Sequence, residues 1–443
     1  MRIKADSSFI FLEDTIVKYP FWLKKTLAEA GLGNWIPGAA NLFNSPNNIL
    51  GSCSDSILQC DFQSFANDEN YQTTPSPDYL DLSCDQIQGL GMPVQVLPRT
   101  LPFKDLSSPE GCSETRDAVS NYLDLEYGVP FNPIKEVLIT NGITHAIQTA
   151  LETFVNPGEN VLLPDPCPPS HEQLVRNHGA NPIWMTLRHE NGRLHFSETE
   201  LKRQMRKSRV SILSNPSIPT GGVFHEEDFL RIGTSALKNN CLLIWDHSLM
   251  GLQLDGSPFH PGNLNETRNL SLNAGSLSIS HGISAANAGW LSGNENLIAP
   301  CKLLLKMRNT STSILSQHIL VNAIEKAQSN EWYEFLHRLG ENRKHNFQKL
   351  ADMGFDPFWP AGGPYIWIPI WRKEISSAHF CEELELKYKV LIKPGTFFGP
   401  SGAGYARVSF GVDEGRSIEA LRRMELYLEN KPLMKPEQIR LAA

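Results

Sequence analysis

The fold is decided by one stretch of the chain, Ser276-Leu-Ser-Ile-Ser-His-Gly-Ile-Ser-Ala-Ala-Asn-Ala-Gly-Trp290. It follows a series of short and nearly continuous apolar runs, at 136–140, 160–163, 210–214 and 241–245. Helical stretches separate these runs, which is the pattern of a buried and mostly parallel sheet with helices on both faces. The sequence therefore predicts an α/β domain around this stretch.

Composition limits the classes of protein to which the chain can belong. Of its 443 residues, 41% are hydrophobic and 20% are charged, as in ordinary globular proteins with two or three domains. The net charge of −8 and the mixed order of acidic and basic residues argue against a nucleic-acid partner, which needs a clustered basic face. No window approaches about 18 apolar residues, and the first residues lack the apolar run of a secretory signal. We therefore expect a cytoplasmic protein that does not enter a membrane.

The cysteines and histidines show no pattern of a disulfide framework or a metal site. Eight cysteines are spread along the chain, and neither Cys-x-x-Cys nor His-Glu-x-x-His occurs. We expect free thiols and no dedicated metal.

The quoted stretch resembles the cofactor-lysine segment of the class I and II aminotransferases, the pyridoxal-phosphate enzymes of fold type I. In that family a Ser-x-Ser pair is followed at once by the lysine that forms a Schiff base with the cofactor. An arginine further along holds the cofactor phosphate, and a Gly-aromatic pair follows it. Five residues fall at the family's positions without a gap: Ser276, Ser278, Gly282, Gly289 and Trp290. The lysine position, however, is Ile279, and the arginine position is Asn287.

Other motifs match in the family's order over about three quarters of the chain. Asn141 and Gly142 lie at the turn before a helix, where free backbone N–H groups suit an anion, and the family uses this turn for the cofactor phosphate. The alternative is an ordinary strand-turn-helix. Asp246 ends an apolar run where the family keeps the aspartate that pairs with the pyridine nitrogen. Three further family positions are altered, with Pro168 for the stacking aromatic residue, Ile218 for the ring-oxygen asparagine and Leu249 for the tyrosine.

The resemblance implies an architecture as well as a site. We expect a large domain with a mostly parallel seven-stranded sheet flanked by helices, and a smaller α+β C-terminal domain. The expected boundaries are 1–105 for an N-terminal arm with an irregular insertion, 106–310 for the large domain, and 311–443 for the small domain with its long connecting helix. The family's arm packs on a partner subunit, so we expect a homodimer.

Three residues are candidates for catalysis. Asp246 without a cofactor nitrogen would be a buried carboxylate with a raised pKa and hence a general base. Its neighbour His247 should point to the opposite face of the strand. His281 lies two residues past the lysine position and could replace the lysine, as histidine does in some relatives, or it is a locally bonded loop histidine. Cys167 would be a nucleophile only if a nearby base lowered the pKa of its thiol, and the alternative is a buried inert cysteine.

The remaining candidates concern binding. Ser276, Ser278, Asn141 and Gly142 would form a residual site for a phosphate or another anion. Arg407 lies in an alternating strand beside Ser409, where the family binds the substrate α-carboxylate through a planar guanidinium. The alternative for Arg407 is an ion pair with a nearby Asp or Glu.

Isoleucine cannot form a Schiff base, so the function depends on what the pocket does without lysine. The first hypothesis is an enzyme with no covalent cofactor that applies acid-base or acyl and condensation-type chemistry to an amino-acid-like carboxylate, in a specialised biosynthetic pathway. The second is a transaminase-like or dehydratase-like enzyme that holds pyridoxal or pyridoxamine phosphate without a covalent bond. The third is a non-catalytic protein that binds a ligand or a partner. A visible absorbance band would separate the second from the other two.

Overall fold

The structure is a computed structural model, and it describes residues 78–93, 108–327, 329–370 and 376–430. Most of the expected N-terminal arm, residues 1–105, lies outside these residues. The domain boundaries at 105 and 310 stay predictions.

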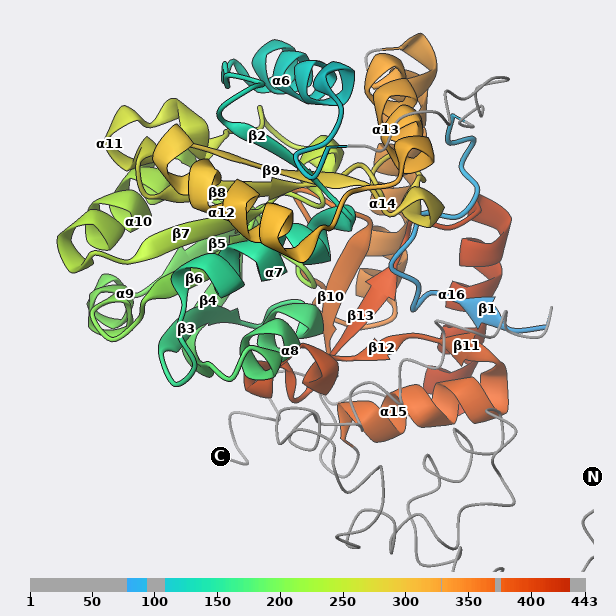
Figure 1. Ribbon diagram of the computed structural model, residues 1–443. Coiled ribbons are helices and arrows are strands. Elements are labelled where there is room, and N and C mark those ends of the chain that lie inside the picture. Colours follow the sequence, from blue (N-terminus) through green and yellow to red (C-terminus); the bar gives the residue numbers. More distant parts are fainter. Residues whose placement is uncertain (1–77, 94–107, 328, 371–375, 431–443) are drawn as a thin grey trace, which may run out of the picture. The chain divides into compact units, whose positions relative to one another are not determined.

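An eight-stranded sheet forms the centre of the large domain, in the order β2-β9-β8-β7-β6-β3-β4-β5 (Figure 1). Its strands are β2 (Val137–Thr140), β3 (Asn160–Asp165), β4 (Asn181–Glu190), β5 (Arg193–Phe196), β6 (Val210–Ser214), β7 (Leu242–Asp246), β8 (Ser271–Gly275) and β9 (Gly289–Gly293). The five strands β4, β3, β6, β7 and β8 run parallel to one another, while β9 is antiparallel to β2 and β8. The mostly parallel sheet is confirmed. The expected seven strands become eight because β5 turns back on β4 as a hairpin.

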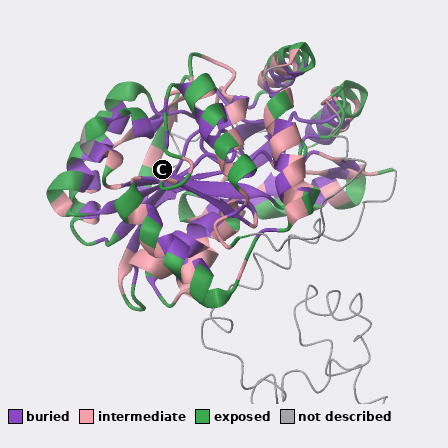
Figure 2. Ribbon diagram, turned by 45° about the horizontal axis from the view of Figure 1, so that its top comes forward, coloured by how far each residue is buried: buried purple, intermediate pink, exposed green. Residues whose placement is uncertain are grey.

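Both faces of this sheet are covered because alternate residues of a strand point to opposite sides. In β7, Leu242 and Ile244 belong to a core under α7, α8 and α12, whereas Leu243 and Trp245 belong to a core under α9 and α10. The large-domain helices are α6 (Ser113–Tyr127), α7 (Gly142–Phe154), α8 (Pro169–Asn177), α9 (Glu198–Met205), α10 (Glu226–Asn239), α11 (Asn265–Arg268) and α12 (Glu295–Arg308). Figure 2 shows the buried strands between helices whose outer faces are exposed.

The C-terminal part is a smaller α+β unit reached through two helices, α13 (Ile314–Lys326) and α14 (Asn330–Asp352). Its antiparallel sheet has the order β10-β13-β12. The elements are β10 (Tyr365–Pro369), α15 (Ser377–Glu383), β11 (Val390–Leu391), β12 (Lys393–Pro394), β13 (Tyr405–Ser409) and α16 (Glu414–Asn430). The early strand β1 (Leu80–Asp81) pairs in parallel with β11, so a segment that precedes the large domain in sequence joins the small one.

Backbone hydrogen bonds join the large domain to the turn that precedes β10. The amides of Leu254 and Asp255 both donate to the carbonyl oxygen of Ala361. The amide of Gly362 donates to the carbonyl oxygen of Gly221, and other backbone hydrogen bonds connect the same segments. This turn therefore lies against the loops that follow β6 and β7, where the candidate site is built.

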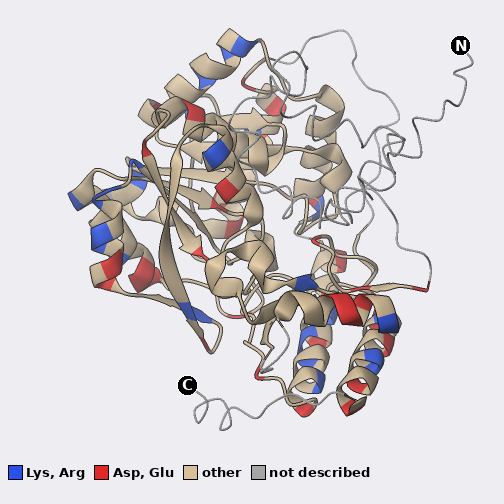
Figure 3. Cartoon of the chain, turned by 90° about the horizontal axis from the view of Figure 1, so that it is seen from below, with Lys and Arg blue, Asp and Glu red and all other residues tan. Residues whose placement is uncertain are grey.

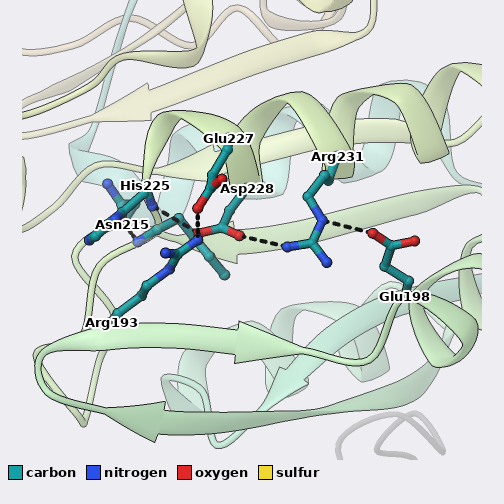
Figure 4. Close-up of polar contacts among 8 residues, drawn as sticks. Arg193, Glu198, Asn215, His225, Glu227, Asp228 and Arg231 are labelled. Carbon is teal, nitrogen blue, oxygen red and sulfur yellow. Dashed lines mark hydrogen bonds and ion pairs between the residues drawn. The ribbon is translucent and has the colours of Figure 1, made fainter.

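A polar network anchors the β4–β5 hairpin to α10 (Figure 4). The carboxylate of Asp228 is buried, and it lies 2.9 Å from a nitrogen of Arg193 and 3.3 Å from one of Arg231. Arg231 also bonds Glu198 on α9 at 2.8 Å. A buried carboxylate needs such partners because water no longer solvates it. Figure 3 shows basic and acidic positions on several of the helices. None of the described helices is long and apolar enough to span a membrane.

Two glycines inside helices should respond in opposite ways to substitution by alanine. A methyl group on Gly233 of α10 would lie 2.1 Å from the Thr267 side chain, whereas a methyl group on Gly340 of α14 would meet no atom within 4 Å. We expect Gly340→Ala to raise the free energy of unfolding by about 0.5–1 kcal/mol, since alanine is the better helix former. Gly233→Ala should lower it by about 1–3 kcal/mol through overpacking. Urea unfolding followed by circular dichroism measures both, and shifts of the same sign would contradict the packing described.

Candidate functional site

Asp246 ends β7 and is buried, with only 4% of its surface exposed. Its Oδ2 lies 2.9 Å from Nε2 of His171 on α8 and 3.4 Å from the Ser214 hydroxyl at the end of β6. Its Oδ1 accepts a hydrogen bond of 2.8 Å from the backbone amide of Ser248. The carboxylate is thus fixed from three sides at the carboxyl ends of the parallel strands, where α/β folds bind their ligands.

The raised pKa predicted for Asp246 is wrong. Burial by itself raises the pKa of this carboxyl group, but the hydrogen bonds and charge from His171 and the bonds from Ser248 outweigh it. The net pKa lies below the ordinary value of 3.8, so the group is ionised at neutral pH. Asp246 is therefore a negative charge held in place by its neighbours, and its catalytic role stays a prediction. Sequence reasoning missed His171, because nothing in a single sequence links this residue of α8 to a carboxylate at the end of β7.

His247 points away from Asp246, as the strand geometry predicted. Its ring stacks on His260 at 4.8 Å between centroids, and its Nε2 lies 3.3 Å from the side-chain oxygen of Asn273. His247 therefore belongs to a buried aromatic layer under the sheet and does not share the surroundings of Asp246.

The four residues predicted for an anion site come together at one place. Helix α7 begins at Gly142, directly after Asn141, and a methyl group on Gly289 would lie 2.8 Å from the Gly142 carbonyl carbon. The Ser276 hydroxyl lies 3.0 Å from the carbonyl oxygen of Ala288, the residue before Gly289, and 2.7 Å from the Ser278 hydroxyl. Since Asp246 pairs with Ala274 in the sheet, its carboxylate and this turn lie at the same edge of the sheet.

Three of the altered family positions carry apolar side chains. Ile218 and Leu249 are buried members of the small domain's hydrophobic core, together with Trp367 and Phe398. Ile279 packs against the same core. The three side chains therefore join one apolar cluster, and none of them offers a polar atom. The sequence did not predict that these three side chains would share one apolar cluster.

Cys167 follows β3 in a closed environment. Its backbone amide donates a 2.9 Å hydrogen bond to the carbonyl oxygen of Phe398, and the side chain is buried. Burial raises the pKa of the thiol well above its usual value, with Glu172 and Asp165 adding to the effect. The lowered pKa that a nucleophile requires is absent here, which favours the alternative of an inert buried cysteine. The six cysteines among the described residues are all free thiols.

His281 is packed against an aromatic ring. The ring stacks on Trp332 at 3.9 Å between centroids, and Nδ1 lies 2.9 Å from the Ser280 hydroxyl. Burial lowers the pKa of His281 to about 3, so the imidazole is neutral at physiological pH. Its Nε2 has no hydrogen-bond partner within the described part of the chain. A catalytic role for His281 stays a prediction.

Arg407 on β13 is fully buried and paired with a carboxylate that the sequence did not reveal. One of its nitrogens lies 2.5 Å from Oδ1 of Asp85, and Oδ2 of Asp85 lies 2.9 Å from Nζ of Lys393. The guanidinium lies 4.0 Å from the Tyr365 ring and 4.9 Å from the Phe398 ring. The ion pair named as the alternative for Arg407 is therefore present. Binding of a substrate carboxylate by Arg407 stays a prediction.

Comparisons with known proteins place this site in a family. Residues 100–424 match the family model described as aminotransferase class I and II. The chain belongs to this family of enzymes. An aromatic-amino-acid aminotransferase of Thermococcus litoralis is 26% identical over 327 residues, covering 73% of this chain and 84% of the relative. An aspartate aminotransferase of Pyrococcus horikoshii is 27% identical over 329 residues, covering 72% and 82%.

Solved structures support the fold of this family member. An aminotransferase of Staphylococcus aureus has a TM-score of 0.74 at 19% identity, covering 85% of this chain and 99% of that one. An aromatic aminotransferase of Pyrococcus horikoshii has a TM-score of 0.72 at 21% identity, covering 83% and 100%. The predicted fold type I architecture is confirmed.

The first functional hypothesis is corrected by these findings. We expected an enzyme with acid-base or acyl chemistry in place of the pyridoxal-phosphate mechanism. The relatives across most of the chain are named aminotransferases, and the family uses pyridoxal phosphate.

Substitutions of His281 should separate packing from catalysis. His281→Phe keeps a ring on Trp332, so we expect its free energy of unfolding to change by less than about 1 kcal/mol, whereas His281→Ala should lose about 2–4 kcal/mol through a cavity. Thermal and urea unfolding measure the difference. A catalytic role would show instead as loss of amino transfer in His281→Phe while its stability is unchanged.

Asp85 should make the protein sensitive to acid. Burial would raise the pKa of Asp85, but Arg407 and Lys393 lower it from 3.8 to about 2. The folded protein therefore binds fewer protons here than the unfolded chain, so the stabilisation is complete above about pH 4 and is lost as the pH falls toward 2. Urea unfolding at a series of acid pH values should show a shallower dependence for Asp85→Asn than for the parent. Equal slopes would contradict the ion pair.

Proposed function

We propose that this chain is an aminotransferase-type enzyme that holds pyridoxal phosphate or pyridoxamine phosphate without a covalent bond. The observation that carries the proposal is Asp246, an ionised and buried carboxylate at the strand end, held by His171. Burying a charge is costly, and a cationic heteroaromatic nitrogen is a partner that makes such a charge useful.

The residues of this chain fit both ends of that cofactor. Asp246 would keep a ring nitrogen protonated through its negative charge, and His171 would keep Asp246 in place. The helix start at Gly142 would offer backbone N–H groups and the positive end of the helix dipole to the phosphate. The hydroxyl of Ser278, which accepts a hydrogen bond from Ser276, would add a donor. When bound, the cofactor supplies an electron-withdrawing ring that stabilises negative charge on the substrate's reacting carbon.

The altered family positions explain why the binding would not be covalent. Ile279 stands where we place the family's lysine, and it cannot bond to an aldehyde. Ile218 and Leu249 likewise provide packing and no hydrogen bonds. Lys393 on β12 is engaged with Asp85. A cofactor held only at its two ends should be exchangeable, and pyridoxamine phosphate should suit the site because it needs no lysine.

The remaining parts of the proposal follow from the family. We propose a small amino-acid-like substrate, a homodimer and a cytoplasmic location. Light scattering at micromolar concentration would test the dimer, and a stable monomer would count against it.

The cofactor proposal is tested by titration of the full-length protein with each cofactor. We expect saturable binding with a change in absorbance, and no pyridoxyl group on any lysine after borohydride reduction and mass spectrometry. Asp246→Asn should weaken binding about 10–100-fold, the value of one charged hydrogen bond of about 1.5–3 kcal/mol. Asp228→Asn, which alters a buried carboxylate in the hairpin network, is the matched control and should bind as the parent does.

Three outcomes would count against this function. A pyridoxyl-lysine would overturn the non-covalent mode, and failure of both cofactors to bind would overturn the proposal as a whole. Binding without conversion of pyridoxamine phosphate by any 2-oxo acid would contradict the enzymatic part and favour a ligand-binding protein.

A further inference from the structure

We infer that Asp85 is a specificity-determining residue, an internal carboxylate that competes with external carboxylates for Arg407. The inference rests on the proposed function, since it concerns which substrates the same protein admits. It follows from the charges, burial and donors around one guanidinium.

One carboxylate serves two cations in this cluster. Asp85 bridges Arg407 through Oδ1 at 2.5 Å and Lys393 through Oδ2 at 2.9 Å. A two-oxygen contact of this kind is the geometry in which a ligand's carboxylate would bind a pair of cationic side chains. Asp85 therefore satisfies the cations in the way that a bound carboxylate would.

Burial differs sharply between the partners. The Arg407 side chain is 0% exposed and that of Lys393 is 8% exposed, whereas the Asp85 side chain is 38% exposed. Tyr365 and Phe398 lie over the guanidinium, so carboxylates can approach only along its edge. Asp85 occupies this edge, and part of its side chain remains exposed. An external carboxylate that binds along this edge would have to replace the Asp85 side chain.

The guanidinium also retains donors that a new partner could use. Nε and Nη1 of Arg407 have no hydrogen-bond partner among the described atoms, although both are buried. Its Nη2 bonds Asp85 and also donates to the carbonyl oxygen of Ser83 at 2.7 Å. Truncation of Asp85 would therefore open a route from solvent to a guanidinium with several unsatisfied donors.

The backbone holds Asp85 in position for this competition. The Tyr365 hydroxyl donates to the Asp85 carbonyl oxygen at 2.7 Å, and the Ser409 amide donates to Leu82 at 2.8 Å. A group tethered at its target acts at a high effective concentration, which an external ligand must exceed. The parent protein should consequently discriminate against ligands that depend on Arg407 for a carboxylate.

The test is the binding of succinate, a carboxylate probe with no amino or keto group, to the full-length protein without added cofactor. Isothermal titration should show at least tenfold tighter binding to Asp85→Ala than to the parent, with Asp85→Asn between them because its amide still fills the space. Adding Arg407→Gln to Asp85→Ala should abolish the gain. The matched control is Asp81→Ala, which removes a nearby carboxylate that bonds Ser83 at 2.7 and 2.8 Å, and it should bind as the parent does.

Stability provides a second measurement in case Asp85→Ala folds poorly. Succinate should raise the melting temperature of Asp85→Ala and Asp85→Asn more than that of the parent, because a ligand stabilises the state that binds it. A purely structural ion pair would give variants whose melting temperature succinate does not raise.

The inference is overturned if the parent binds succinate as tightly as Asp85→Ala, or if the gain persists without Arg407. Because no cofactor is present, neither result depends on whether the cofactor proposal holds.

Discussion

A charge removed from water must find a partner inside the protein, and this constraint organises both ends of the candidate site. The Asp246 carboxylate remains ionised because His171 and Ser248 bond to it. The Arg407 guanidinium is fully buried because Asp85 bonds to it. Without these partners the desolvation cost would drive Asp246 toward its neutral form and would force Arg407 toward solvent. Each partner comes from a different element, so the pairing also holds the elements together.

Three of the altered family positions are apolar. Ile218 and Leu249 continue the core of the small domain into the loops of the large one, with Ile279 at its edge. In a family that uses pyridoxal phosphate, polar groups at such positions would direct the cofactor and hold it covalently. Apolar side chains at these positions can provide neither hydrogen bonds nor a covalent bond.

The small domain contributes other groups to the site besides the strand that carries Arg407. Phe398 packs over the guanidinium, and its carbonyl oxygen accepts the Cys167 amide at the end of β3. The segment around β1 adds Asp85 and pairs with β11. One early segment, one C-terminal loop and the ends of the parallel strands are thereby connected. A change in any of them would alter the position of charges in the others.

The sequence by itself determined the architecture and the position of Asp246. Apolar runs between helical stretches predict a buried parallel sheet because alternation and burial are local properties of a strand, and four of these runs became strands β2, β3, β6 and β7. The same local geometry predicted that Asp246 and His247 diverge. Only the tertiary structure decided the sign of the Asp246 pKa shift and the partner of Arg407. His171 lies 75 residues from Asp246, and Asp85 lies on a segment from the other end of the chain. Tertiary packing decides which residues at such separations come into contact. The periodicity of a single sequence does not indicate these contacts.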